Sequence, residues 1–366
     1  MLEETVNPQV SVVVGTRPEI VKLAPIVRIL GAQASLVHSG QHTDQELSGV
    51  FFSAAGLPVP QALTGICGQP RYVQVARIVE QLGARYAQRP PAAVLVQGDT
   101  NTAQAAAQAG HYAGVPVVHV EAGLRSFDRR MPEELNRCLI GVLADLHCAP
   151  TERSVANLVG EGVPARRIVL TGNTIVEATR AMMPGDQEAS QIVAGAGVEP
   201  DRYVLATIHR PENTDDPERL GIILDELSKL GPPVLLPLHP RTRLAAQRHG
   251  LDAALDRLVT LPPADHRTFL GLARHARLLV SDSGGVQEEC TVLKRPLIVV
   301  RNSTERPESI EAGFAHLVQP GPVLGDLGRE LIGDPGLAGR LARVPCPYGD
   351  GTASEQIAAR LRNYLN

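Results

Sequence analysis

VLVQGDTNTAQAAAQAGHYAGVPVVHVEAGLRSFDRRMPEELNR, residues 94–137, contains two short apolar runs, VLV and VVHV, separated by a stretch of helical period. A carboxylate follows each run, Asp99 after the first and Glu121 after the second. A third acid, Glu133, opens the next helical pattern behind a proline. Ligands of open α/β sheets bind at the carboxyl ends of strands, and carboxylates that share such a crevice raise one another's pKa. The segment therefore predicts acid/base chemistry on a small molecule.

The whole chain repeats this alternation of short apolar runs and longer helical patterns, which is typical of a parallel sheet with helices on both faces. The first series of predicted strands is 10–14, 34–37, 93–96, 117–120, 146–149 and 168–170. The second series is 203–206, 234–236, 258–260, 278–280 and 297–300. Predicted helices include 19–30, 72–87, 102–112, 133–143, 218–230, 267–274 and 286–293. The fold class is therefore α/β, with two Rossmann-like domains.

A Pro/Gly break, MMPGDQE, separates the two series and marks a linker. We expect an N-terminal domain over residues 1–183 with the carboxylates, and a C-terminal domain over 184–350. Residues 351–366 form a last amphipathic helix without an obvious partner in the second sheet. A return of this helix to the first domain stays open at this stage.

The composition limits the classes of function. The chain has 366 residues, 43% of them hydrophobic and 20% charged, as in soluble globular proteins. A net charge of −4 without a Lys/Arg block argues against a nucleic-acid partner, and no apolar run approaches the ~20 residues of a membrane helix. Five cysteines without a C-x-x-C pair, and histidines without metal spacing, predict a cytoplasmic protein with no metal.

The first strand leads into GTRPEIVKLAP, residues 15–25. A glycine turn before a helix N-terminus offers N–H groups and a positive dipole to an anion, and Arg17 and Lys22 add full charges. A helix start with a solvated Arg17 is the structural alternative. There is no G-x-G-x-x-G fingerprint of a dinucleotide cofactor.

Each acid of the opening segment also has a structural alternative. Asp99 lies where an aspartate most often caps a helix, and Glu133 and Glu134 could be ordinary first-turn acids. Glu121 is harder to explain structurally, because an acid after a buried strand costs desolvation.

The second series carries cations and glycines at its predicted strand ends. His209 and Arg210 follow one strand, and His239 follows the next. Side chains of these types at strand ends are suited to bind a phosphate or to transfer a proton. SDSGGVQEE, residues 281–289, leads from a strand through Ser-Gly-Gly into a helix, which suits a phosphate. Glu288 and Glu289, one turn into the helix, are placed to accept hydrogen bonds from the hydroxyl groups of a ribose.

Seven motifs resemble, in order along nearly the whole chain, the non-hydrolysing UDP-N-acetylglucosamine 2-epimerases: GTRPE, GDT, VEAGLR, PEELNR, HRPEN, SDSGGVQEE and STERPE. The resemblance implies a fold of the glycosyltransferase-B type with the ligand cleft between its domains, and a homodimer. It implies interconversion of UDP-GlcNAc and UDP-ManNAc by removal of the C2 proton and expulsion of UDP, without a cofactor.

The same resemblance implies roles for individual residues. Those it makes catalytic are Asp99, Glu121, Glu133 and His209. Those it assigns to substrate binding are Arg17, Lys22, Gln41, His42, Arg125, Arg210, His239, Ser283, Gly284, Gly285, Glu289 and Arg306. Gln41, His42 and His239 fit only part of the activator cluster of some members, so we expect weak or absent activation by a second substrate molecule.

Other functions stay open. SFDRRM and HRPEN are more similar to the branch that includes enzymes acting on UDP-2,3-diacetamido-uronic acids, where Arg129 or Arg130 would meet a C6 carboxylate. Two arginines on the protein surface are the structural alternative. A UDP-sugar glycosyltransferase would share the fold but needs no acids around C2. A hydrolysing epimerase and an inactive nucleotide-sugar sensor are the remaining alternatives.

Overall fold

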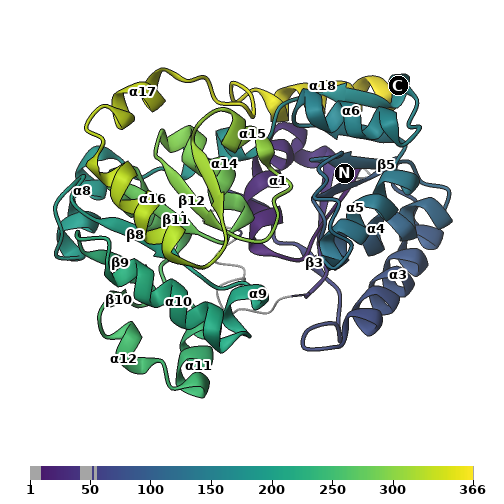
Figure 1. The fold of residues 1–366 in the computed structure, drawn as a ribbon. Helices are drawn as coiled ribbons and strands as arrows, with labels where there is room; N and C mark the ends of the chain where they lie inside the picture. The colour runs from purple at the N-terminus through teal and green to yellow at the C-terminus, as the bar shows by residue number, and fades with distance from the viewer. Residues whose placement is uncertain (1–9, 42–51, 53–55, 366) are drawn as a thin grey trace. The chain divides into compact units, whose positions relative to one another are not determined.

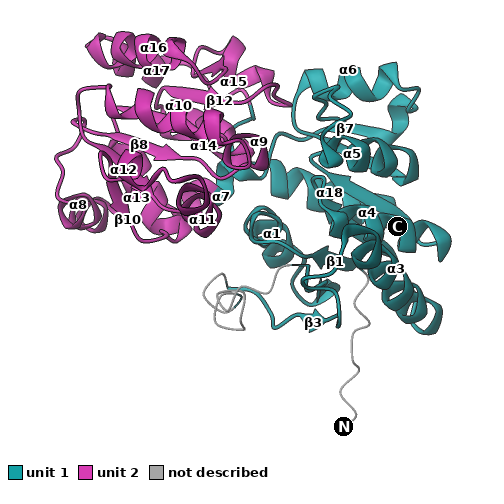
Figure 2. Cartoon of the chain, turned by 60° about the horizontal axis from the view of Figure 1, so that its bottom comes forward, with its two compact units in different colours: residues 1–178, 348–366 teal, residues 179–347 magenta. Residues whose placement is uncertain are grey.

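The structure, a computed structural model, describes residues 10–41, 52 and 56–365. It confirms the α/β class with two parallel sheets (Figure 1). The chain divides into two compact units, residues 1–178 with 348–366 and residues 179–347 (Figure 2). The sequence pattern placed these divisions at 183/184 and 350/351. No helix within the described residues is long and apolar enough to cross a membrane.

Unit 1 contains a seven-stranded parallel sheet in the order β3-β2-β1-β4-β5-β6-β7. Its strands are β1 Val10–Val14, β2 Ala34–His38, β3 Gln61–Ala62, β4 Ala93–Gln97, β5 Val117–Val120, β6 Leu146–Ala149 and β7 Ile168–Leu170. Its helices are α1 Arg17–Leu30, α3 Arg71–Gln88, α4 Asn101–Tyr112, α5 Pro132–Leu143, α6 Glu152–Gly160, α7 Ile175–Met182, which runs past the end of the unit, and α18 Ala353–Leu365.

Unit 2 contains a six-stranded parallel sheet in the order β10-β9-β8-β11-β12-β13. Its strands are β8 Val204–Thr207, β9 Val234–Pro237, β10 Val259–Leu261, β11 Leu278–Ser281, β12 Leu297–Val300 and β13 Ala315–Val318. Its helices are α8 Asp186–Gly195, α9 Pro211–Thr214, α10 Pro217–Ser228, α11 Pro240–His249, α12 Asp252–Leu255, α13 His266–His275, α14 Gly284–Leu293, α15 Pro307–Glu311, α16 Pro322–Gly333 and α17 Leu337–Arg343.

Alternating side chains of the strands enter two cores, one on each face of a sheet. In unit 1, Val12 packs toward α1, whereas Val13 packs toward α3 and α4. In unit 2, Val204 and Leu205 enter opposite cores in the same way. Burial on both faces explains why the strands are continuous apolar runs rather than alternating ones.

The C-terminal helix α18 belongs to unit 1, where it packs against α1 (Figure 1). Ile357, Ala358 and Leu361 are buried in the same core as β1. This apolar face therefore has its partner near the start of the chain, at a distance in sequence that no local pattern reveals.

Candidate functional site

Each sheet reverses its strand order at one point, and such switch points are where open α/β sheets bind ligands. The reversal lies between β1 and β4 in unit 1 and between β8 and β11 in unit 2. Arg17 follows β1 and Asp99 follows β4, whereas His209 follows β8 and Ser283 follows β11. These four predicted residues therefore lie at the switch points of their units.

Glu121 is the centre of a buried polar network at the end of β5. Its Oε2 accepts from Lys22 Nζ at 2.5 Å and from Gln97 Nε2 at 2.8 Å, and Asn173 Nδ2 lies 3.5 Å away. Its backbone has φ 65°, a left-handed conformation that costs a non-glycine residue energy and is concentrated at functional sites. Lys22, predicted to meet a phosphate, is thus an ion-pair partner of Glu121 in this structure.

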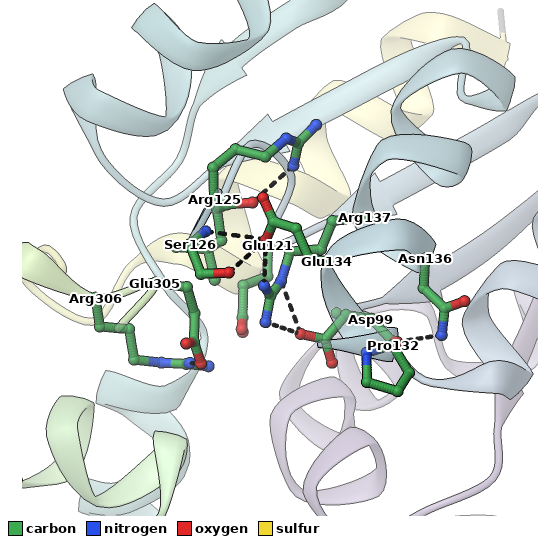
Figure 3. A network of polar contacts seen from close by, with 12 residues as sticks. Asp99, Glu121, Arg125, Ser126, Pro132, Glu134, Asn136, Arg137, Glu305 and Arg306 are labelled. Atoms are coloured by element: carbon green, nitrogen blue, oxygen red, sulfur yellow. Dashed lines mark hydrogen bonds and ion pairs between the residues drawn. The ribbon is translucent and has the colours of Figure 1, made fainter. Parts of the chain in front are cut away.

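Asp99 is held by α5 of the same unit. Arg137 donates to Asp99 Oδ2 from Nε at 2.8 Å and from Nη2 at 2.5 Å, and to Glu134 Oε2 from Nη1 at 2.7 Å (Figure 3). Asn136 Nδ2 donates to the Asp99 backbone carbonyl at 2.7 Å. One buried guanidinium therefore compensates two acids, and the turn after β4 is fixed by two successive residues of α5.

The two acids that begin α5 differ in their surroundings. Glu134 is buried and accepts from the backbone N–H groups of Ser126 and Phe127, each at 2.9 Å. Burial alone would raise the pKa of Glu134, but these hydrogen bonds and Arg137 outweigh it and the pKa is lowered. Glu133 is half-buried and accepts no hydrogen bond from the described part of the chain. Glu134 is thus held by the 126–127 loop and by Arg137, whereas the half-buried Glu133 has no hydrogen-bond donor among the described residues.

The turn from β1 into α1 is organised by Glu19. Glu19 Oε2 accepts from Gly15 N at 2.9 Å and from Thr16 N and Oγ1 at 2.8 Å, and its Oε1 accepts from Thr100 Oγ1 at 2.7 Å. Burial raises the pKa of Glu19 to about 7, although these hydrogen bonds lower it. A Cβ on Gly15 would lie 2.0 Å from Thr102 Oγ1, so only glycine fits this turn.

A buried histidine supports the loop that carries Asp99. His119, on β5, lies with Nε2 2.8 Å from the Gly98 carbonyl oxygen. Burial lowers the pKa of His119 to about 3, so the ring is neutral near pH 7 and its Nε2–H donates to the carbonyl.

Other predicted residues of unit 1 have structural partners. Gln41 Oε1 accepts from Thr102 N at 2.9 Å, at the beginning of α4. Arg125 forms a two-point ion pair with Glu161 at 2.6 and 2.7 Å. Arg17 is half-buried at the first position of α1. The predicted residue His42 lies outside the described residues.

In unit 2, Asp282 fixes the turn after β8. Its carboxylate is fully buried and accepts from Arg210 N at 2.9 Å, from Asn213 Nδ2 at 3.1 Å and from His209 N at 3.0 Å. The His209 and His239 rings lie with centroids 5.3 Å apart. Asp282 thereby presents His209 at the end of the strand, with its side chain 38% exposed.

The beginning of α14 brings together the Ser-Gly-Gly turn and Arg306. Ser283 is the N-cap residue, and its side chain makes no capping hydrogen bond. A Cβ on Gly284 would lie 2.8 Å from Arg306 Nη1, so glycine allows the guanidinium to approach the helix. Arg306 is paired with Glu288 at 2.8 Å. It is also paired with Glu305, which lies beside it (Figure 3).

The two acids of α14 therefore differ. Glu288 is fully buried and paired with Arg306, so it is not available for a ribose. Glu289 Oε1 lies 2.7 Å from His266 Nε2. No group of three His, Cys, Asp or Glu side chains arranged to hold a metal occurs among the residues that the structure describes.

Sequence reasoning missed the residues that hold the predicted ones in place. These are Glu19, Gln97, His119, Arg137, His266 and Asp282. The capping box T-x-x-E at 16–19 was a readable signal. Arg137 and Glu134 lie three positions apart on α5. The other contacts join residues far apart in the chain, so no local pattern predicts them.

Comparisons with known proteins agree over nearly the full length. A family model described as UDP-N-acetylglucosamine 2-epimerase matches residues 28–362. The UDP-N-acetylglucosamine 2-epimerase of Methanocaldococcus jannaschii is 35% identical, over 95% of this chain and 97% of the relative. The UDP-2,3-diacetamido-2,3-dideoxy-D-glucuronate 2-epimerase of Pseudomonas aeruginosa is 34% identical, over 95% of this chain and 98% of the relative.

A solved structure agrees with the fold. The crystal structure of the M. jannaschii UDP-GlcNAc 2-epimerase in complex with UDP-GlcNAc and UDP matches with a TM-score of 0.87 at 34% identity. The match covers 97% of this chain and 99% of that one.

Proposed function

Because the chain belongs to the UDP-N-acetylglucosamine 2-epimerase family, we propose that it interconverts UDP-GlcNAc and UDP-ManNAc. The C2 proton is removed, the bond from C1 to the diphosphate oxygen breaks, and a 2-acetamido glycal and UDP result. Return of UDP to C1 with protonation of C2 on the opposite face gives the epimer. The observation that carries the proposal is Glu121, buried in strained backbone with a lysine on its carboxylate.

The acids of unit 1 supply the proton chemistry. Removal and return of a proton on opposite faces of C2 needs more than one acid/base group. Asp99, Glu121 and Glu133 fill this role in the proposal. Lys22 compensates the buried charge of Glu121, and Arg137 compensates Asp99, so both carboxylates are held in one orientation.

The residues of unit 2 bind the leaving group. Expulsion of UDP places negative charge on the diphosphate oxygens, which preorganised donors stabilise. His209, Arg210 and the N-terminus of α14 provide such donors, and Glu289 accepts from the ribose hydroxyls. Because elimination and addition require no oxidation, the reaction proceeds without NAD.

Deuterium exchange tests the reaction. The protein is incubated with UDP-GlcNAc in D2O without an acceptor, and the anomeric and C2 protons are followed by NMR. We expect UDP-ManNAc with deuterium at C2 in both epimers. Free ManNAc would instead point to a hydrolysing enzyme, and absence of both exchange and product would refute the proposal.

The variant Glu121→Gln tests the acid. It keeps the size of the side chain but removes the charge, so we expect exchange at C2 to fall by roughly 10²-fold or more. Glu177→Gln is the matched control, because Glu177 is a carboxylate of the same unit that accepts a backbone hydrogen bond from Ser354 at 2.7 Å, outside the network of Glu121. Retained exchange in Glu121→Gln would remove Glu121 from the mechanism.

The sugar is tested with a second substrate, since one relative acts on a diacetamido-glucuronate. In the segment 126–131, Arg130 already shares its guanidinium with Asp128 at 2.8 Å, so of the two predicted arginines it is the one with an acid partner in the segment itself. We expect kcat/KM to be higher for UDP-GlcNAc than for UDP-2,3-diacetamido-glucuronate. The reverse ratio would reassign the substrate.

The homodimer is also a proposal. Tyr72 on α3 is 75% exposed, Tyr112 on α4 is 69% exposed and Val142 on α5 is 82% exposed. Burial of such side chains favours association. Light scattering after size-exclusion chromatography is expected to give the mass of two chains, and the mass of one chain would contradict this.

A cytoplasmic location is also a proposal, and the cysteines support it. No disulfide joins any of the five cysteines within the described part of the chain, as in proteins kept in a reducing compartment. Fractionation of cells that produce the protein is expected to recover it with cytoplasmic markers, and recovery outside that fraction would contradict the proposal.

A further inference from the structure

His266 is held at both edges of its ring beside Glu289. Its Nε2 lies 2.7 Å from Glu289 Oε1, and its Nδ1 lies 3.3 Å from Met182 Sδ. The His266 side chain is 16% exposed and that of Glu289 is 8% exposed. The pair is therefore largely screened from water, and its geometry is fixed by packing as well as by the hydrogen bond.

The direction of the hydrogen bond follows from the chemistry of the two groups. A carboxylate oxygen is an acceptor and a ring N–H is a donor, so we assign the hydrogen to Nε2 of His266, which donates to Oε1. A hydrogen bond to an ionised group is stronger than one between neutral groups, and stronger still away from water. Oε1 is thus occupied and the orientation of the carboxylate is set.

The second carboxylate oxygen of Glu289, Oε2, differs from Oε1 in its hydrogen bonding. Oε2 accepts no hydrogen bond from the residues that the structure describes, and Glu289 lies one turn into α14, behind the Ser-Gly-Gly turn. Oε1 of Glu289 lies 4.0 Å from the position that a Cβ on Gly285 would take. The carboxylate is therefore beside the proposed phosphate site, with one oxygen fixed and one oxygen left to accept.

We propose that His266 is a positioning residue that fixes Glu289 and thereby makes the site select a ribose diol over a deoxygenated sugar. The inference rests on the proposed function, in which Glu289 binds the ribose. A carboxylate that is already fixed through one oxygen accepts hydrogen bonds from the ribose hydroxyls with little further loss of side-chain conformational entropy. Without His266 the side chain loses its donor, and it turns toward water instead of being preorganised.

Isothermal titration calorimetry with UDP and with 2′,3′-dideoxy-UDP tests the inference. The wild type is expected to prefer UDP by roughly tenfold or more, the value of a hydrogen bond to a charged group. His266→Ala is expected to reduce this preference to less than roughly threefold, whereas His266→Gln, whose amide nitrogen donates from a similar position, keeps most of it. The control His316→Ala changes a half-buried histidine on β13 and is expected to keep the full preference.

The ratio of the two affinities separates positioning from general damage to the fold. Loss of stability weakens binding of both nucleotides and leaves their ratio unchanged. A wild-type ratio in His266→Ala, together with a lost ratio in Glu289→Gln, would overturn the role of His266. A wild-type ratio in Glu289→Gln would overturn the premise that Glu289 reads the ribose. Failure of the wild type to bind UDP would refute the proposed function itself.

Discussion

Replacement of Glu19 by glutamine tests how burial sets the ionisation of a carboxylate in the β1–α1 turn. Burial raises the pKa of Glu19 from 4.5 to about 7. Between these values the folded chain keeps a proton that the unfolded chain has lost, so the stabilising contribution is complete below pH 4.5 and is lost as the pH rises through 7. At ~1.4 kcal/mol per unit, the loss is about 3 kcal/mol.

Glutamine is neutral at every pH and does not lose this contribution. The difference in free energy of unfolding, wild type minus Glu19→Gln, is therefore expected to fall by about 3 kcal/mol between pH 4.5 and a pH above 7. Urea unfolding followed by far-UV circular dichroism measures it at each pH. Glu152→Gln, on the exposed first turn of α6, is the control for removal of one carboxylate. A difference that stays constant within about 1 kcal/mol would refute the reasoning.

Two further substitutions follow from the contacts of the site. Arg137→Met removes the cation shared by Asp99 and Glu134. We therefore expect urea unfolding to show a free energy of unfolding lower by about 3 kcal/mol or more, and NMR to show slower exchange of the C2 proton. A free energy of unfolding unchanged within about 1 kcal/mol would contradict the first expectation. Asp282→Asn replaces one accepting oxygen beneath His209 by a donor, so calorimetry is expected to show UDP binding weakened by roughly tenfold. Unchanged affinity would show that the turn is held by other contacts.

The strands were readable because their burial on both faces makes them continuous apolar runs. Residues 10–14 and 117–120 were predicted with the bounds that the structure has. The edge strand β13, Ala315–Val318, was missed because His316 is half-buried and Leu317 is exposed, which breaks the apolar run. The two-residue β3 is too short to produce any pattern.

The positions of Asp99 and Glu121 at strand ends were also readable, since the carboxyl ends of parallel strands share one edge. The choice between Glu133 and Glu134 was not, because both are first-turn residues and only the packing of the 126–127 loop decides which one is buried. The pairing of Lys22 with Glu121 joins residues 99 positions apart. Such a contact depends on the register of a helix against a sheet.

The sequence alone determined the two parallel α/β units and the strand ends that carry acidic and basic residues, because both depend on local periodicity. It also determined the family, because short motifs in a fixed order identify it. Only the tertiary structure decided which of those groups are paired and which stay accessible. Glu134, Glu288 and Arg125 are committed to partners, whereas Glu133 accepts nothing from the described residues and Glu289 keeps one oxygen open. The reason is physical: a buried charge must find its partner across the fold, and that partner is chosen by packing.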